Sequence, residues 1–128
     1  MPTPIIHTTG GALVYLLTGN LDINRWYIVT GVTVLSSLPD LDFLIPGPHR
    51  GFSHSLAFCI LCSAVVGYLT KFSYLSVFSI LVSHLLLDSL ADGFYTVSWL
   101  WPFYSYSAET SYGWNNIIGM IKHALRVF

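Results

Sequence analysis

The sequence predicts an all-α protein: a small membrane-embedded helical bundle of about four helices plus an interfacial C-terminal helix. Hydrophobic residues make up 54% of the 128 residues and charged residues only 9%, against about a quarter in soluble domains. Long apolar segments alternate with short polar turns. A soluble helical domain is the alternative, because no apolar run reaches the ~20 residues of a full span. The length fits a single domain over residues 1–128.

The boundaries of the four apolar segments follow from prolines and polar residues. Apolar residues begin directly after MPTP, with no basic region typical of a signal peptide. Pro39 stops the second segment, and the short turn around Lys71 joins the third and fourth as a helical hairpin. The predicted helices cover residues 5–19, 26–38, 55–70 and 74–91.

The C-terminal part has a different composition. Residues 94–107 are rich in Trp and Tyr, which is typical of a membrane interface. Residues 114–128 repeat apolar side chains at helical spacing, so we expect an amphipathic helix against the bundle or the membrane surface.

Composition and motifs exclude several functions. The net charge of −1 and five scattered basic residues give no support for nucleic-acid binding. Cys59 and Cys62 form a C-x-x-C inside an apolar helix and are interpreted as packing residues. No phosphate-binding loop, dinucleotide fingerprint or G-x-S-x-G motif is present.

Residues 39–55, PDLDFLIPGPHRGFSHS, contain the densest group of functional side chains. Three prolines and two glycines make an extended helix unfavourable there, so we expect a loop. This loop carries five polar residues suited to chemistry: Asp40, Asp42, His49, Arg50 and His54.

Chain reversal places other polar residues at the same end. If each apolar segment reverses direction, His7, the central loop and the pair His84 and Asp88 meet on one side, whereas Asp22, Asp92 and His123 are left out. His84 and Asp88 are four residues apart and share a helical face. An ionised Asp in an apolar helix costs about 3 kcal/mol unless it is paired. A divalent cation would compensate, and mixed imidazole and carboxylate ligands favour zinc, manganese or iron.

Four ordered motifs and a leading His7 carry a family resemblance. They are LPDLD at 38–42, HRGFSHS at 49–55, SHLLLD at 83–88 and WPF at 101–103. The chain resembles the YdjM-like family, described as LexA-binding, inner-membrane-associated metal-dependent hydrolases. The resemblance implies a multi-pass location in the inner (plasma) membrane.

The order of the ligand-type residues is also distantly similar to that of zinc-dependent phospholipase C and the single-strand nucleases. This similarity implies a metal-ligand set with Asp88 as a bridge, formed by His7, Asp40, His54, His84 and Asp88. No His and Glu pair clearly supplies a third zinc site, so we expect one or two ions.

We assign Asp42, His49 and Arg50 to catalysis, and each has alternatives. Asp42 could orient a histidine, act as a general base or form a turn. His49 could be a metal ligand or an acid, and Arg50 a phosphate clamp; the alternative for both is an ordinary polar loop at the membrane surface. Ser55 is expected to cap the third helix.

The sequence therefore predicts a membrane-bound metal-dependent hydrolase, a phosphoesterase that uses metal-activated water. Flanking aromatic residues favour a membrane lipid or lipid-linked phosphate as substrate. The alternative is a non-enzymatic metal-binding membrane protein, either an ion carrier or a partner-binding regulator. Whether the chain forms a homo-oligomer is left open.

Overall fold

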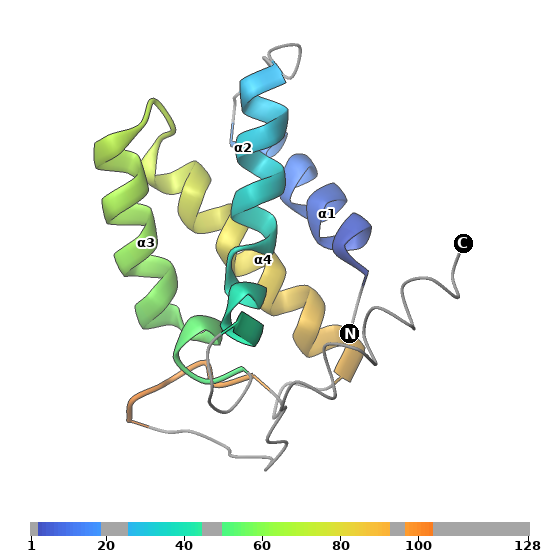
Figure 1. The fold of residues 1–128 in the computed structure, drawn as a ribbon, viewed down its shortest axis with the longest axis vertical. Helices are drawn as coiled ribbons and strands as arrows, with labels where there is room; N and C mark the ends of the chain where they lie inside the picture. The colour runs from blue at the N-terminus through green and yellow to red at the C-terminus, as the bar shows by residue number, and fades with distance from the viewer. Residues whose placement is uncertain (1–2, 19–25, 45–49, 93–96, 104–128) are drawn as a thin grey trace.

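The structure, a computed structural model, describes residues 3–18, 26–44, 50–92 and 97–103. These residues form an all-α bundle (Figure 1), which confirms the predicted fold class. Each helix begins and ends within two residues of its predicted limits. The elements are α1 (Pro4–Leu17), α2 (Trp26–Ser37), η1 (Pro39–Leu44), η2 (Phe52–His54), α3 (Leu56–Leu69) and α4 (Tyr74–Asp92).

Local sequence explains where the helices begin and end. Pro4 occupies the first turn of α1, where its missing N–H costs no hydrogen bond, and Pro39 follows the end of α2. Ser55 caps α3 as predicted, since its Oγ accepts a hydrogen bond from the Phe58 N–H at 3.1 Å. Ser73 serves α4 in the same way through the Ser76 N–H at 3.1 Å.

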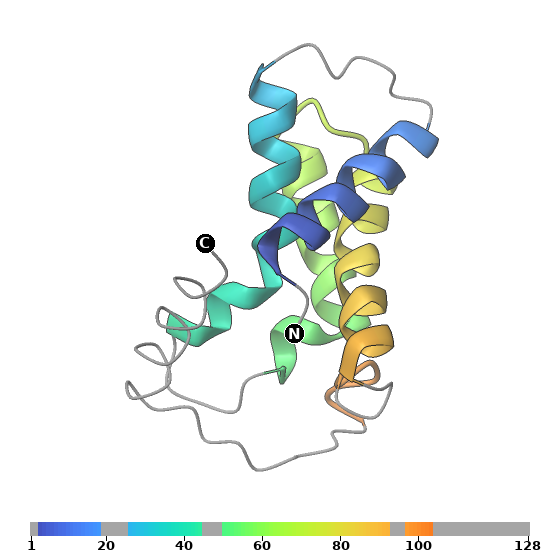
Figure 2. The same ribbon diagram turned by 90° about the vertical axis from the view of Figure 1, so that its right-hand side faces the viewer.

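Helix α4 is the centre of the bundle and packs against α1, α2 and α3 (Figures 1 and 2). Its buried apolar residues, among them Val77, Ile80, Leu81 and Leu85, are joined in the core by residues such as Tyr15 of α1. It has 19 residues and a mean hydropathy of 1.6, and within the described ranges no other helix is long and apolar enough to cross a membrane.

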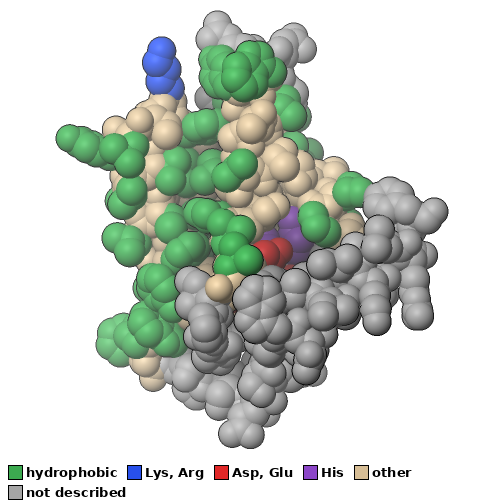
Figure 3. All heavy atoms as spheres, viewed as in Figure 1, with side chains coloured by type: hydrophobic (Ala, Val, Ile, Leu, Met, Phe, Trp, Pro, Cys, Tyr) green, Lys and Arg blue, Asp and Glu red, His purple; other side chains and the backbone are tan. Residues whose placement is uncertain are grey.

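Large apolar side chains also cover the outside of the bundle (Figure 3). Leu17 of α1 and Leu69 of α3 are 76% and 72% exposed. Many others share this position, including Leu13, Val34, Ile60, Leu61, Val65, Leu75 and Leu90. An apolar surface of this extent is suited to lipid.

The segment predicted as a loop contains two short 3-10 helices, η1 and η2, on either side of the undescribed residues 45–49. Short 3-10 turns are common connectors between helices. Residues 97–103 form turns that contact α3 and α4, because the Trp99 carbonyl accepts from the Leu56 N–H at 3.1 Å and the Trp99 Nε1–H donates to Ser89 Oγ at 3.1 Å. The predicted helix at 114–128 lies outside the described residues.

Candidate metal centre

Every acidic residue and every histidine that the structure describes lies at one end of the bundle. Four of the six Asp and Glu residues and three of the five His residues are described. They meet where α1 begins, α4 ends and the two 3-10 helices lie (Figure 2). This set consists of His7, Asp40, Asp42, His54, His84, Asp88 and Asp92.

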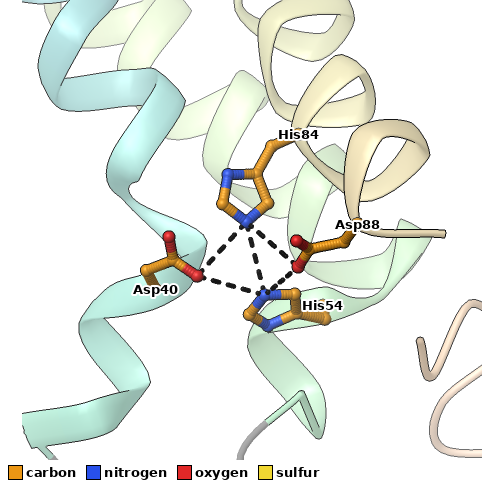
Figure 4. A group of neighbouring side chains, drawn as sticks. All are labelled: Asp40, His54, His84 and Asp88. Carbon is orange, nitrogen blue, oxygen red and sulfur yellow. Dashed lines mark hydrogen bonds and ion pairs between the residues drawn. The ribbon is translucent and has the colours of Figure 1, made fainter. Parts of the chain in front are cut away.

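Four of these side chains direct one ligand-type atom each toward a common point (Figure 4). Asp40 comes from η1, His54 from η2, and His84 and Asp88 from α4. Their four atoms all lie within 4.8 Å of one another. Asp40 is partly exposed, whereas the other three residues are fully buried.

The spacing of these four atoms is that of a metal-ligand set. The two imidazole Nε2 atoms are 3.3 Å apart, and His54 Nε2 lies 3.6 Å from Asp40 Oδ1 and 3.3 Å from Asp88 Oδ2. His84 Nε2 lies 3.4 Å from Asp40 Oδ1 and 3.6 Å from Asp88 Oδ2. Ligands at about 2.1 Å from a tetrahedral ion lie about 3.4 Å from one another. Five of the six distances match this value, and the Asp40 and Asp88 oxygens lie within 4.8 Å of each other, so the residues present fit a single metal ion.

The hydrogen bonds of the cluster are incomplete without a cation. Asp40 Oδ1 and both carboxylate oxygens of Asp88 are buried and have no hydrogen-bond partner among the described residues. Burying an unpaired carboxylate oxygen is costly, whereas a metal ion satisfies it directly.

The backbone of α2 determines which nitrogen of His84 faces the cluster. His84 Nδ1 lies 2.6 Å from the Ser36 carbonyl oxygen, which can only accept, so Nδ1 carries the hydrogen and Nε2 offers its lone pair. Gly11 of α1 allows this arrangement, because a methyl group there would collide with Ser36 Oγ.

Asp42 lies behind His54 and outside the four-ligand set. Its Oδ2 accepts hydrogen bonds from Ser53 Oγ at 2.6 Å and from the Arg50 N–H at 3.0 Å. The same oxygen is 3.5 Å from His54 Nδ1, the nitrogen that faces away from the cluster. Of the three roles considered for Asp42, this position matches the carboxylate that orients a metal-binding histidine.

His7 lies beside the four-ligand set, next to the Asp88 oxygen that faces away from His54 and His84. Its Nε2 lies 3.5 Å from Asp88 Oδ1, and its ring stacks on that of His84 with centroids 3.9 Å apart. His7 Nδ1 is buried without a hydrogen-bond partner among the described residues. Asp88 therefore presents one oxygen to His54 and His84 and the other to His7.

Arg50 reaches the cluster from the loop, and His49 lies outside the described residues. The guanidinium contacts Asp92 through Nη2 at 2.5 Å, and its Nε is 3.7 Å from Asp88 Oδ2. Asp92 was not among the residues that chain reversal placed at the site, and the structure brings it to Arg50 because α4 continues to this residue. Its position one helical turn after Asp88 is the signal that could have revealed it.

Two groups on the 3-10 helices have strongly shifted pKa values. Burial alone would raise the pKa of Asp40, but the His54 and His84 imidazoles, whose Nε2 atoms lie 3.6 and 3.4 Å from Asp40 Oδ1, outweigh it and hold that pKa well below the usual range. Burial alone would lower the pKa of His54, yet the carboxylates of Asp40, Asp42 and Asp88, 3.3–3.6 Å from its ring nitrogens, raise it to about 10. Without metal, a protonated His54 thus supplies positive charge among the carboxylates.

Fold and site together define a small all-α membrane-type protein with a His and Asp cluster that could hold a metal ion. The chain belongs to the YdjM inner membrane protein family, whose family model matches residues 1–126. It is 34% identical over 122 residues to the inner membrane protein YbcI of Escherichia coli (strain K12), with 80% of this chain and 68% of YbcI covered. No solved structure matches the chain.

These comparisons confirm the family resemblance based on the motifs and the predicted inner-membrane class of protein. Neither description mentions a metal, a substrate or a reaction. Ligand roles, catalysis and the number of membrane passes therefore stay predictions.

Proposed function

We propose that this protein is a metal-dependent hydrolase of the inner membrane that cleaves a phosphoester with metal-activated water. The observation that carries the proposal is that five of the six distances among the ligand atoms of Asp40, His54, His84 and Asp88 are 3.3–3.6 Å and that all four atoms lie within 4.8 Å of one another. Two imidazoles and two carboxylates favour zinc, with manganese or iron as alternatives. A bound ion of this kind lowers the pKa of water and neutralises charge on phosphate oxygens.

Access to the site supports an enzyme. The Asp40 side chain is 24% exposed, and acidic side chains are visible on the molecular surface in Figure 3. A catalytic metal needs an open coordination position, and the exposed side at Asp40 would let water reach an ion held by the four residues.

Charge counting favours a second ion if the substrate is anionic. The four aspartates and Arg50 carry a formal charge of −3, so one divalent ion leaves −1 and two give +1. The second ion would be held between His7 Nε2 and Asp88 Oδ1, which are 3.5 Å apart. Asp88 would then bridge two ions, as the similarity to phospholipase C implies.

The apolar exterior supports a multi-pass protein that acts on a lipid or lipid-linked phosphate. Helix α4 is long and apolar enough to cross a membrane, whereas α1, α2 and α3 have 12–14 residues, extend about 18–21 Å and would cross only where the ~30 Å hydrocarbon core is locally thinner. Their exposed leucines, isoleucines and valines suit lipid contact along the whole bundle. We therefore propose that α1–α4 are all embedded and that the metal site lies at a membrane boundary.

The rival function is a metal-binding membrane protein without catalysis, such as an ion carrier or a partner-binding regulator. Four protein ligands are enough to fill a tetrahedral shell, and closed shells are typical of structural sites. A carrier would hold its ligands near the bilayer midplane. Here they gather at helix ends, which favours the enzyme or the regulator.

The test begins with metal analysis of the detergent-purified protein, followed by a panel of soluble phosphoesters and phosphatidic acid micelles. We expect about one or two transition-metal ions per chain and hydrolysis that stops after chelation and returns with metal. His84→Ala should lose both metal and activity. A protein that retains stoichiometric metal and cleaves no member of the panel would favour the non-enzymatic rival.

A further inference from the structure

We propose that Asp92 is a positioning residue whose carboxylate holds the Arg50 guanidinium against the metal cluster and thereby builds an anion-binding side of the site. The inference deepens the proposed function and rests on it for the nature of the anion. It assigns a role to a residue that the sequence left outside the site.

The contacts of Arg50 show how the guanidinium is held. Nη2 donates to Asp92 Oδ2 at 2.5 Å, while Nε lies 3.7 Å from Asp88 Oδ2. That Asp88 oxygen is also one of the four clustered ligand atoms, 3.3 Å from His54 Nε2. The Arg50 side chain is only 12% exposed, and its Nε is buried without a hydrogen-bond partner among the described residues. The guanidinium therefore has donor capacity left beside the cluster.

The backbone of Arg50 adopts a conformation that favours glycine. Its φ of 64° lies in the left-handed region, which is unfavourable for a residue with a Cβ. Glycine would adopt this φ without the cost, and the hydrogen bond from the Arg50 N–H to Asp42 Oδ2 would remain available to it. The ion pairs on α4 give a physical reason for arginine here.

The two carboxylates at the end of α4, Asp88 and Asp92, have different partners. Asp88 and Asp92 are four residues apart, so their side chains follow one another on one face. Asp88 contacts the histidines, whereas Asp92 takes the far end of the guanidinium. Without Asp92, the guanidinium would be free to turn fully onto Asp88 or toward solvent. In both cases its fork would no longer face an anion bound at the cluster.

The experiment measures inorganic phosphate binding to the metal-loaded, detergent-purified protein by titration calorimetry, with metal content determined on the same samples. Asp92→Asn keeps the size of the side chain and removes its charge, and Asp92→Glu restores the charge. Arg50→Gly removes the guanidinium while suiting the backbone. Lys71→Ala is the control, because Lys71 is exposed at the opposite end of α4.

We expect Asp92→Asn to retain metal and to bind phosphate about three- to tenfold more weakly, with recovery in Asp92→Glu. In the Arg50→Gly background, Asp92→Asn should cause no further loss, because its effect passes through the guanidinium. Tighter phosphate binding by Asp92→Asn would overturn the inference, since it would mean that Asp92 competes with the anion. Equal losses in both backgrounds, or a metal-loaded parent that binds no phosphate, would also overturn it.

Failure of the proposed function gives a different result. A parent protein that binds phosphate in an Asp92-dependent manner but hydrolyses no phosphoester would contradict catalysis and leave the positioning role intact.

Discussion

The two halves of α4 bury polar groups in different ways. In the first half, Ser76 Oγ is within hydrogen-bond distance of Thr18 Oγ1 at 3.0 Å and Ser73 Oγ at 2.7 Å, and Ser83 Oγ donates to the Ile80 carbonyl at 2.7 Å. In the second half, both carboxylate oxygens of Asp88 are buried and have no hydrogen-bond donor among the described residues.

This difference indicates that the first half of α4 serves helix packing and the second half serves a binding site. The buried hydroxyl groups form hydrogen bonds with one another or with a backbone carbonyl. Their hydrogen bonds are therefore made inside the bundle, and they can join helices in an apolar environment. Buried carboxylates that face imidazole nitrogens require a positive charge beside them, which a metal ion or a protonated histidine supplies. Substitutions in the first half should therefore change stability alone, whereas substitutions in the second half should change metal binding.

The largest effect is expected for Asp88→Asn, which keeps the side-chain volume but removes a charged ligand shared by the cluster and His7. Metal affinity, measured by competition with a chromophoric chelator, should fall by more than about 100-fold. This loss is larger than that expected for a residue that only hydrogen-bonds to a metal ligand. Parent-like affinity in this variant would show that the four-residue cluster does not hold the metal.

A smaller effect is expected for Asp42→Asn, because Asp42 contacts His54 Nδ1 and supplies no atom to the cluster. Metal affinity should fall by about 10–100-fold while the stoichiometry at saturating metal stays that of the parent. Complete loss of metal would instead make Asp42 a direct ligand, and the same chelator competition distinguishes the two results.

The smallest effect is expected for Ser76→Ala, which removes the hydroxyl contacts with Thr18 and Ser73. The free energy of unfolding in detergent should decrease by about 0.5–1.5 kcal/mol, and metal affinity should not change. This variant is also the matched control for Asp88→Asn on the same helix. A loss of metal affinity would contradict the division of α4 into two functional halves.

Local signals in the sequence determined the helices and the end of the bundle that carries the site. Pro39 ends α2 and Ser55 caps α3 because of backbone hydrogen bonding that is local to the chain. Counting chain reversals then placed His7 on the same side as His84, which the structure confirms by stacking their rings. The pairing of His84 with Asp88 followed from helical spacing alone.

Only the tertiary structure decided which of these side chains contact the four-ligand set directly and which lie behind it. The crossing of α1 over α4 puts His7 on the far oxygen of Asp88, and the turn at η2 places Asp42 behind His54. The Arg50 backbone bends into the left-handed region, and its side chain meets Asp92 across 42 positions of sequence. Sequence periodicity indicates which residues are neighbours within one helix. Contacts between segments depend on how helices cross and how loops turn, and no local sequence pattern predicts those contacts.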